Sequence, residues 1–127
     1  MTAPDPSSSP TILLVDDEQS VRSIVVKILR RAKYNVLEAE NGEAALRISE
    51  AHPEKIDLLL SDMFMPGLRG PEVAQALAPK RPGLRVLFMS GYADPPIPDD
   101  VLLEKPVTPA ALARKVSEVL HQPALAD

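Results

Sequence analysis

The chain has 127 residues, of which 45% are hydrophobic and 25% are charged, a size and composition that suit one globular domain with its own core. It contains no cysteine, which excludes disulfide frameworks, thiol nucleophiles and cysteine-ligated metal sites. A net charge of −4 with 3% aromatic residues argues against direct nucleic-acid binding. Since no apolar run approaches the roughly 18 residues of a membrane helix and the start lacks a secretory pattern, we expect a cytoplasmic domain without membrane contact.

The two ends of the chain are expected to lie outside this domain. Residues 1–10 (MTAPDPSSSP) contain three prolines, three serines and no apolar set to bury, which predicts a disordered N-terminal tail. Residues 122–127 are predicted to form a frayed C-terminal tail. The folded domain is therefore expected over residues 11–121.

The first half of the domain alternates strand and helix patterns. Residues 12–15 (ILLV) form a continuous apolar run, which fits a strand buried on both faces. A helix is predicted next, because apolar residues recur at the spacing of one helical face: Val21, Ile24, Val25, Ile28 and Leu29. Residues 35–40 (NVLEAE) alternate like an edge strand, and a turn at Asn41 and Gly42 leads into a helix over 43–51.

The middle of the domain repeats the strand and helix pattern. Residues 57–61 (DLLLS) are another continuous apolar run, and residues 65–67 (MPG) then interrupt regular structure. A helix is predicted to start with Gly70 as its cap, Pro71 at the first helical position and Glu72 in the first turn.

The last elements complete the alternation. Residues 84–89 (LRVLFM) and 101–103 (VLL) are predicted strands, and a helix opens at Thr108 and Pro109. Its inward face consists of Leu112, Val116, Val119 and Leu120. Strands that alternate with helices in this way predict an α/β fold, in which a parallel sheet carries helices on both faces.

Polar side chains follow these strands at their carboxyl ends, which meet at one edge of a parallel sheet, where ligands bind. They are Asp16, Asp17, Asp62, Ser90 and Lys105. Crowded carboxylates repel one another unless a cation lies among them, and carboxylate oxygens favour Mg²⁺. A lysine and a hydroxyl suit phosphoryl oxygens, so the set fits phosphoryl transfer. Each residue also has an ordinary interpretation: an acidic helix cap, a turn residue, a solvated lysine or a loop serine.

Four segments in this order resemble the receiver domain of two-component response regulators. They are residues 13–18 (LLVDDE), 62–67 (DMFMPG), 89–92 (MSGY) and 105–106 (KP), and the resemblance covers roughly residues 11–121. It implies a flavodoxin-like, doubly wound, five-stranded parallel sheet with the strand order 2-1-3-4-5. It also implies a signalling domain that catalyses only its own phosphorylation and dephosphorylation.

The resemblance further implies a role for each site residue. Asp62 would accept a phosphoryl group from a histidine kinase or a histidine phosphotransfer protein. Mg²⁺ would be bound by Asp17, Asp62 and the backbone carbonyl of Phe64, and by Asp16 through a water molecule. Lys105 and Ser90 would contact the phosphoryl group.

Two departures from the family pattern leave the output of the domain open. Leu102 occupies the position, three residues before Lys105, where the family usually has an aromatic switch residue. Residues 94–100 (DPPIPDD) contain three prolines, so we expect the family's fourth helix to be missing or much shortened. Dimerisation through that helix is therefore in question. The alternative function is a pseudo-receiver, an interaction module whose phosphorylation switch is altered or lost.

Overall fold

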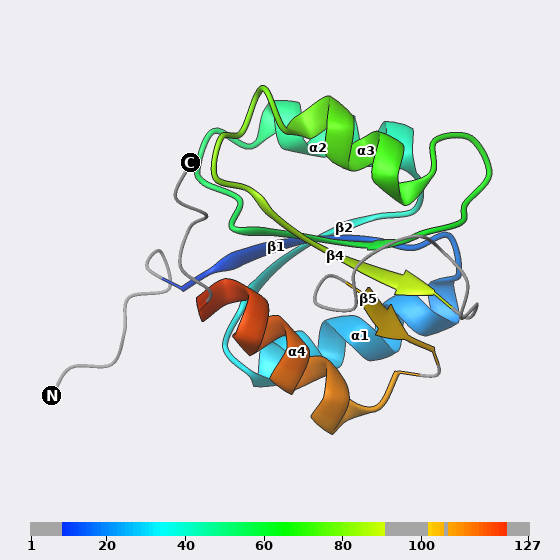
Figure 1. Cartoon of the computed structure of the whole chain (residues 1–127), viewed down its shortest axis with the longest axis vertical. Coiled ribbons are helices and arrows are strands. Elements are labelled where there is room, and N and C mark those ends of the chain that lie inside the picture. The colour runs from blue at the N-terminus through cyan, green and yellow to red at the C-terminus, as the bar shows by residue number, and fades with distance from the viewer. Residues whose placement is uncertain (1–8, 91–101, 106, 122–127) are drawn as a thin grey trace, which may run out of the picture.

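A computed structural model describes residues 9–90, 102–105 and 107–121 and shows one parallel sheet covered by helices on both faces (Figure 1). The strand order is β2-β1-β3-β4-β5, which confirms the predicted fold class and topology. In chain order the elements are β1 (Thr11–Val15), α1 (Gln19–Arg31), β2 (Asn35–Ala39), α2 (Gly42–Ala51), β3 (Leu58–Asp62), α3 (Gly70–Leu77), β4 (Arg85–Ser90), β5 (Leu102–Glu104) and α4 (Pro109–His121).

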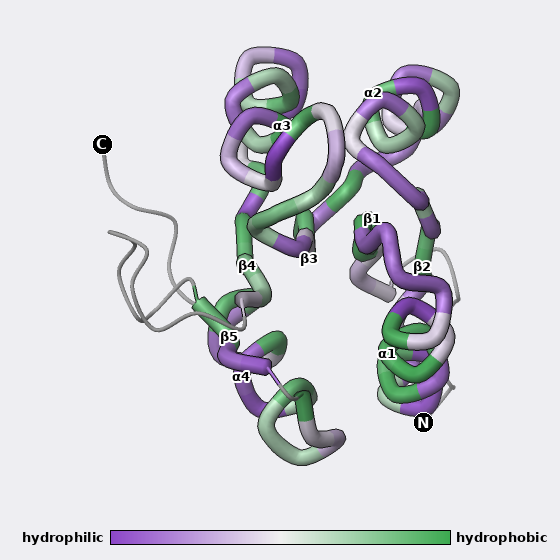
Figure 2. The backbone as a smooth tube through the Cα atoms, turned by 90° about the vertical axis from the view of Figure 1, so that its right-hand side faces the viewer, coloured by the Kyte–Doolittle hydropathy of each residue, from purple (hydrophilic) through white to green (hydrophobic). Residues whose placement is uncertain are grey.

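Helices α1 and α4 cover one face of the sheet, and α2 and α3 cover the other (Figure 2). Side chains alternate along a strand, so both faces of a central strand contribute to a core. In β1, Ile12 and Leu14 join the core under α1 and α4, whereas Leu13 and Val15 join the core under α2 and α3. The continuous apolar runs of the sequence are explained by this burial on both sides.

The buried face of α1 differs from the predicted one. Val25, Val26 and Leu29 are buried, while Ile24 is 57% exposed. Successive residues lie about 100° apart around a helix, so a face centred on these three residues leaves Ile24 beyond its margin. The apolar periodicity located the helix correctly, but contacts with the sheet and α4 rotate its buried face towards Val26.

Two helices begin one residue away from their predicted starts. Asn41, predicted as part of a turn, caps α2 by accepting a hydrogen bond from the Ala44 N–H at 2.7 Å. In α3 the cap is Arg69 rather than Gly70, and its N–H donates to Glu72 Oε1 at 2.8 Å. Gly70 is thus the first residue of α3, a position that matters for the site below.

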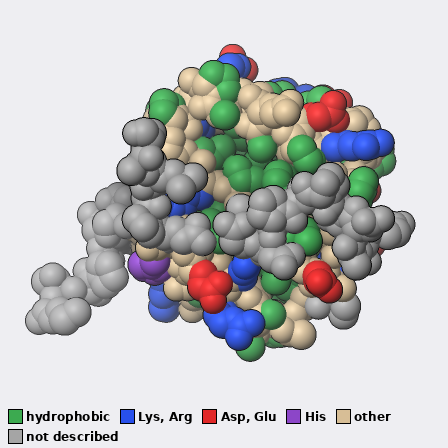
Figure 3. All heavy atoms as spheres, viewed as in Figure 1, with side chains coloured by type: hydrophobic (Ala, Val, Ile, Leu, Met, Phe, Trp, Pro, Cys, Tyr) green, Lys and Arg blue, Asp and Glu red, His purple; other side chains and the backbone are tan. Residues whose placement is uncertain are grey.

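Some predictions fall outside the described residues. These are the tail residues 1–8 and 122–127, the segment 91–101 where the fourth helix was expected to be lost, and Pro106. None of the described helices is long and apolar enough to cross a membrane. On the face shown in Figure 3, the Lys and Arg side chains of the described residues stand apart and do not form one basic block.

The rotated face of α1 is tested by two substitutions in the same helix. Leu29→Ala should lower the free energy of unfolding by about 2–5 kcal/mol, because Leu29 is fully buried. Ile24→Ala should change it by less than about 0.5 kcal/mol, because Ile24 is largely exposed. Urea denaturation followed by circular dichroism measures both, and equal losses would contradict the placement of Ile24.

Candidate functional site

Three carboxylates meet at the carboxyl end of the sheet. β1 and β3 are neighbours in parallel register, with Val15 opposite Ser61, so Asp16 and Asp62 follow at adjacent positions. One carboxylate oxygen from each of Asp16, Asp17 and Asp62 lies within 4.8 Å of the others. The structure therefore brings together the three acidic residues singled out in the sequence.

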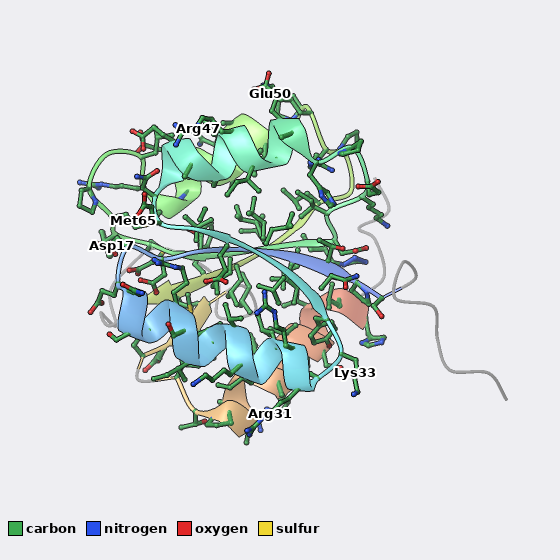
Figure 4. All side chains as sticks on the ribbon, turned by 180° about the vertical axis from the view of Figure 1, so that it is seen from behind. Asp17, Arg31, Lys33, Arg47, Glu50 and Met65 are labelled. Atoms are coloured by element: carbon green, nitrogen blue, oxygen red, sulfur yellow. The ribbon has the colours of Figure 1, made fainter. Side chains whose placement is uncertain are left out.

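Backbone hydrogen bonds extend the sheet one residue past its strand ends and fix where each loop begins. The N–H groups of Asp16, Met63 and Lys105 donate to carbonyl oxygens on the neighbouring strand at 3.2, 2.9 and 2.8 Å. The site side chains thus project from a hydrogen-bonded edge. Figure 4 shows Asp17 and Met65 at this end of the molecule and Arg31 and Lys33 at the other end of α1.

Asp16 is a fully buried carboxylate with one unsatisfied oxygen. Its Oδ1 accepts a hydrogen bond from the Glu18 N–H at 2.9 Å, whereas its buried Oδ2 has no hydrogen-bond partner among the described residues. Burial raises the pKa of the Asp16 carboxyl above its ordinary value. A buried anionic oxygen without a hydrogen bond costs stability, and a cation bound at this position would reduce that cost.

Asp62 shares a lysine with the other acidic residues of the site. Lys105 Nζ donates a hydrogen bond to Asp62 Oδ2 at 3.2 Å and lies 3.7 Å from Asp16 Oδ2 and 3.9 Å from Glu18 Oε1. Burial raises the pKa of Asp62, while Lys105 and a hydrogen bond from the Phe64 N–H oppose that rise. Burial lowers the pKa of Lys105, but Asp16, Asp62 and Glu18 together outweigh burial and raise it. One ammonium therefore faces several carboxylates, which leaves the site with excess negative charge.

The remaining predicted site residues lie near this cluster in the fold. Ser90 is buried at the end of β4, one residue after Met89, which is the register partner of Asp62. Phe64 presents its backbone to Asp62 through the hydrogen bond above, and its ring is 43% exposed. The Arg69 guanidinium lies 5.8 Å from the centre of that ring, so the two side chains form a cation–π contact at the edge of the site.

Gly70 has a role that the sequence analysis did not assign. A Cβ atom at Gly70 would lie 2.5 Å from the Asp62 carbonyl oxygen and 3.2 Å from Ser61 Oγ. The Ser61 hydroxyl in turn donates to that carbonyl oxygen at 2.9 Å. The absence of a side chain at Gly70 lets α3 approach the backbone of Asp62 closely. The sequence marked Gly70 only as a helix start, because its contact partner is eight residues away.

A comparison with protein families identifies the domain. A family model described as the response regulator receiver domain matches residues 12–117. The chain belongs to this family. The four segments noted in the sequence and the strand order of the sheet agree with a receiver domain of two-component signalling proteins.

Individual relatives agree with this assignment. The chain is 37% identical over 127 residues to the sensor kinase CckA of Brucella abortus (strain 2308), covering 94% of this chain but only 13% of the kinase. It is 32% identical over 116 residues to the response regulator receiver protein CpdR of that strain, covering 86% of this chain and 95% of CpdR.

Solved structures of receiver domains have the same fold. A crystal structure of the receiver domain from the hybrid histidine kinase CckA is 40% identical, with a TM-score of 0.77, and the match covers 87% of this chain and 99% of that chain. The chemotaxis protein CheY4 of Vibrio cholerae is 26% identical, with a TM-score of 0.79, and the match covers 88% of this chain and 99% of that chain.

The cost of burying the Asp16 carboxylate is tested in metal-free buffer. Because the folded-state pKa of Asp16 lies above its ordinary value, its ionised form lowers stability at neutral pH, and this cost disappears as the pH falls through the raised pKa. Asp16→Asn should therefore raise the free energy of unfolding in EDTA at pH 7.5. In saturating Mg²⁺ the order should reverse, because the ion stabilises the wild type more.

Asp57→Asn is the matched control for this measurement. Asp57 precedes β3 at the opposite end of the sheet, where its Oδ2 accepts a hydrogen bond from the Thr11 N–H at 2.8 Å. This variant should keep the wild-type response to Mg²⁺. If Asp16→Asn were less stable than the wild type in EDTA as well as in Mg²⁺, the cost assigned to Asp16 would be wrong.

Proposed function

We propose that this receiver domain accepts a phosphoryl group on Asp62 from a phosphorylated histidine of a kinase or a phosphotransfer protein. In this step an Asp62 carboxylate oxygen attacks phosphorus, the bond from phosphorus to the histidine nitrogen breaks, and an acyl phosphate forms. The observation that carries the proposal is the position of Asp62, whose carboxylate accepts a hydrogen bond from Lys105 Nζ at 3.2 Å and clusters with the carboxylates of Asp16 and Asp17.

The donor set fits Mg²⁺ as the cofactor. Asp16, Asp17 and Asp62 supply hard carboxylate oxygens, and the backbone carbonyl of Phe64 is proposed as a further ligand. The Oδ2 of Asp16, which is buried without a hydrogen-bond partner among the described residues, supports a cation among these groups. When bound, Mg²⁺ would neutralise charge on the phosphoryl oxygens.

Lys105 and Ser90 are proposed to contact the transferred group. The Lys105 ammonium already lies within hydrogen-bond distance of Asp62, so it can pair with a phosphoryl oxygen attached there. Ser90 ends the strand next to Asp62 and can donate its hydroxyl proton to another phosphoryl oxygen. In this proposal the domain transforms no external substrate beyond the phosphodonor and hydrolyses only its own acyl phosphate.

An apolar groove beside Lys105 is where we propose that the histidine-bearing partner docks, through a helix with apolar side chains. The groove has a volume of about 180 Å³ and is lined by Val21, Ile24, Val25, Lys105 and Val107. Because Lys105 belongs both to the groove and to the acidic site, a partner seated here would reach Asp62. Such partners obtain phosphoryl groups from ATP, so a cytoplasmic location goes with the proposal.

One observation favours the pseudo-receiver as a second candidate. Leu102 begins β5 opposite Phe88 of β4, so the position of the usual aromatic switch is held by a half-buried aliphatic side chain. A leucine cannot present a ring or hydroxyl to either side of the sheet. In a pseudo-receiver, Mg²⁺ and a phosphoryl mimic such as beryllofluoride would change amide NMR signals only around the site, with little change along β5 and α4.

The proposed function is tested by phosphorylation in vitro. With acetyl phosphate and Mg²⁺, the wild type should gain the mass of one phosphoryl group, and Asp62→Asn should gain none, because the attacking carboxylate is missing. Intact-protein mass spectrometry measures both. Equal labelling of the two proteins would reject Asp62 as the acceptor.

A third variant separates the chemistry from docking. Ile24→Arg places a charge in the apolar groove but leaves the acidic residues unchanged. It should be labelled by acetyl phosphate at the wild-type rate and several-fold more slowly by a phosphohistidine protein that labels the wild type. Equal rates from the protein donor would show that the partner docks elsewhere.

A further inference from the structure

We infer that Arg22 is a positioning residue that sets the orientation of the metal-binding turn between β1 and α1, with Glu38 of β2 as its anchor. The inference rests on the proposed function, since it concerns how Asp16 and Asp17 are presented to Mg²⁺. Arg22 lies in the first turns of α1, and its side chain is only 15% exposed. Helix α1 itself lies beside β1 and β2 (Figure 2).

Arg22 holds one particular peptide group of the site. Its Nη1 donates a hydrogen bond to the carbonyl oxygen of Asp16 at 2.7 Å. That carbonyl belongs to the peptide bond joining Asp16 to Asp17. Because a peptide group is planar, fixing its carbonyl also fixes the direction in which the chain leaves Asp16 and enters Asp17. One contact therefore sets the backbone from which both aspartate side chains project.

The other hydrogen bonds of the turn do not replace this contact. The Asp16 N–H donates to the Ala39 carbonyl at 3.2 Å, and the Glu18 N–H donates to Asp16 Oδ1 at 2.9 Å. The first bond fixes the backbone on the N-terminal side of the Asp16–Asp17 peptide group, and the second fixes the backbone at Glu18, on its C-terminal side. The Arg22 bond fixes the peptide between the two acidic residues. At 2.7 Å the Arg22 bond is also the shortest of the three, and its donor is charged, which strengthens a hydrogen bond.

Glu38 balances the charge of Arg22. Arg22 Nε lies 3.6 Å from Glu38 Oε1 on the edge strand β2, so the guanidinium contacts both the turn after β1 and β2. Because this partner neutralises the guanidinium, Arg22 supplies geometry to the turn without competing with a cation for the site carboxylates. A lysine carries its N–H donors on a single nitrogen and lacks the planar fork with which Arg22 reaches the two acceptors from two separate nitrogens.

Arg30 provides a matched control on the same helix. Its Nη2 also pairs with Glu38, at 3.9 Å, but its side chain is 59% exposed and no contact of Arg30 with Asp16 is recorded among the described residues. Removing Arg30 changes the net charge by the same amount as removing Arg22 and leaves the Asp16 carbonyl bond in place. A general charge effect would therefore appear in both variants, and a positioning effect would appear only at Arg22.

The test is Mg²⁺ binding by isothermal titration calorimetry to the full chain, at a temperature where circular dichroism shows every variant folded. Arg22→Ala should weaken Mg²⁺ binding about 10-fold, as loss of a group behind metal ligands commonly does. Arg22→Lys should recover part of the loss, Glu38→Gln should weaken binding less than Arg22→Ala, and Arg30→Ala should bind as the wild type does. Phosphorylation of Arg22→Ala should require more Mg²⁺ but reach the wild-type rate at saturation.

Several results would overturn the inference. Wild-type Mg²⁺ affinity in Arg22→Ala, an equal loss in Arg30→Ala, or a loss of the saturated rate with unchanged Mg²⁺ dependence would each contradict a positioning role. If Arg22→Ala does not fold, Arg22→Lys and Glu38→Gln decide the question by the same criteria. A wild type that binds no Mg²⁺ would remove the proposed function as well, whereas wild-type binding that survives in Arg22→Ala would remove only this inference.

Discussion

Electrostatic repulsion among acidic side chains at the carboxyl end of the sheet is the constraint on which the site depends. The register of β1 with β3 places Asp16 beside Asp62, and Asp17 follows directly in the chain. Two carboxylates about 5 Å apart, at an effective dielectric constant of about 20, repel by about 3 kcal/mol. Lys105 offsets part of this repulsion through its contacts with Asp62 and Asp16. The excess negative charge that remains would favour binding of a divalent cation, and the bound cation would in turn favour a phosphoryl group beside it.

The rest of the fold holds these charges in place. The two apolar cores fix the sheet between two layers of helices, so that the strand ends are held rigidly by burial. Around the site, Gly70 lets α3 approach the Asp62 backbone, and Arg22 links the Asp16 carbonyl to β2. The acidic residues therefore stand on a frame whose geometry is set by packing and backbone hydrogen bonds. The buried Asp16 and Asp62 therefore cannot relieve their repulsion by moving their backbones apart.

The sequence was sufficient to predict those features that depend on periodicity and on strand ends. Continuous apolar runs at residues 12–15 and 57–61 predicted strands buried on both faces, and both strands are central in the sheet. The acidic cluster followed from the rule that parallel strands end together. The exposure of Ile24 and the contacts of Gly70 and Arg22 were not predictable, because they depend on which elements pack together. The expectation of a lost helix within residues 91–101 stays a prediction.

The most direct test of the account is a calorimetric titration of the wild type and Asp17→Asn with Mg²⁺. Asp17 is the exposed member of the acidic cluster, so its substitution changes the metal donors without disturbing a core. We predict that the wild type binds one ion per chain and that its unfolding temperature rises with Mg²⁺, whereas both responses shrink strongly in Asp17→Asn. Identical titration curves for the two proteins, or no binding to the wild type, would contradict the claim that these carboxylates form a metal site.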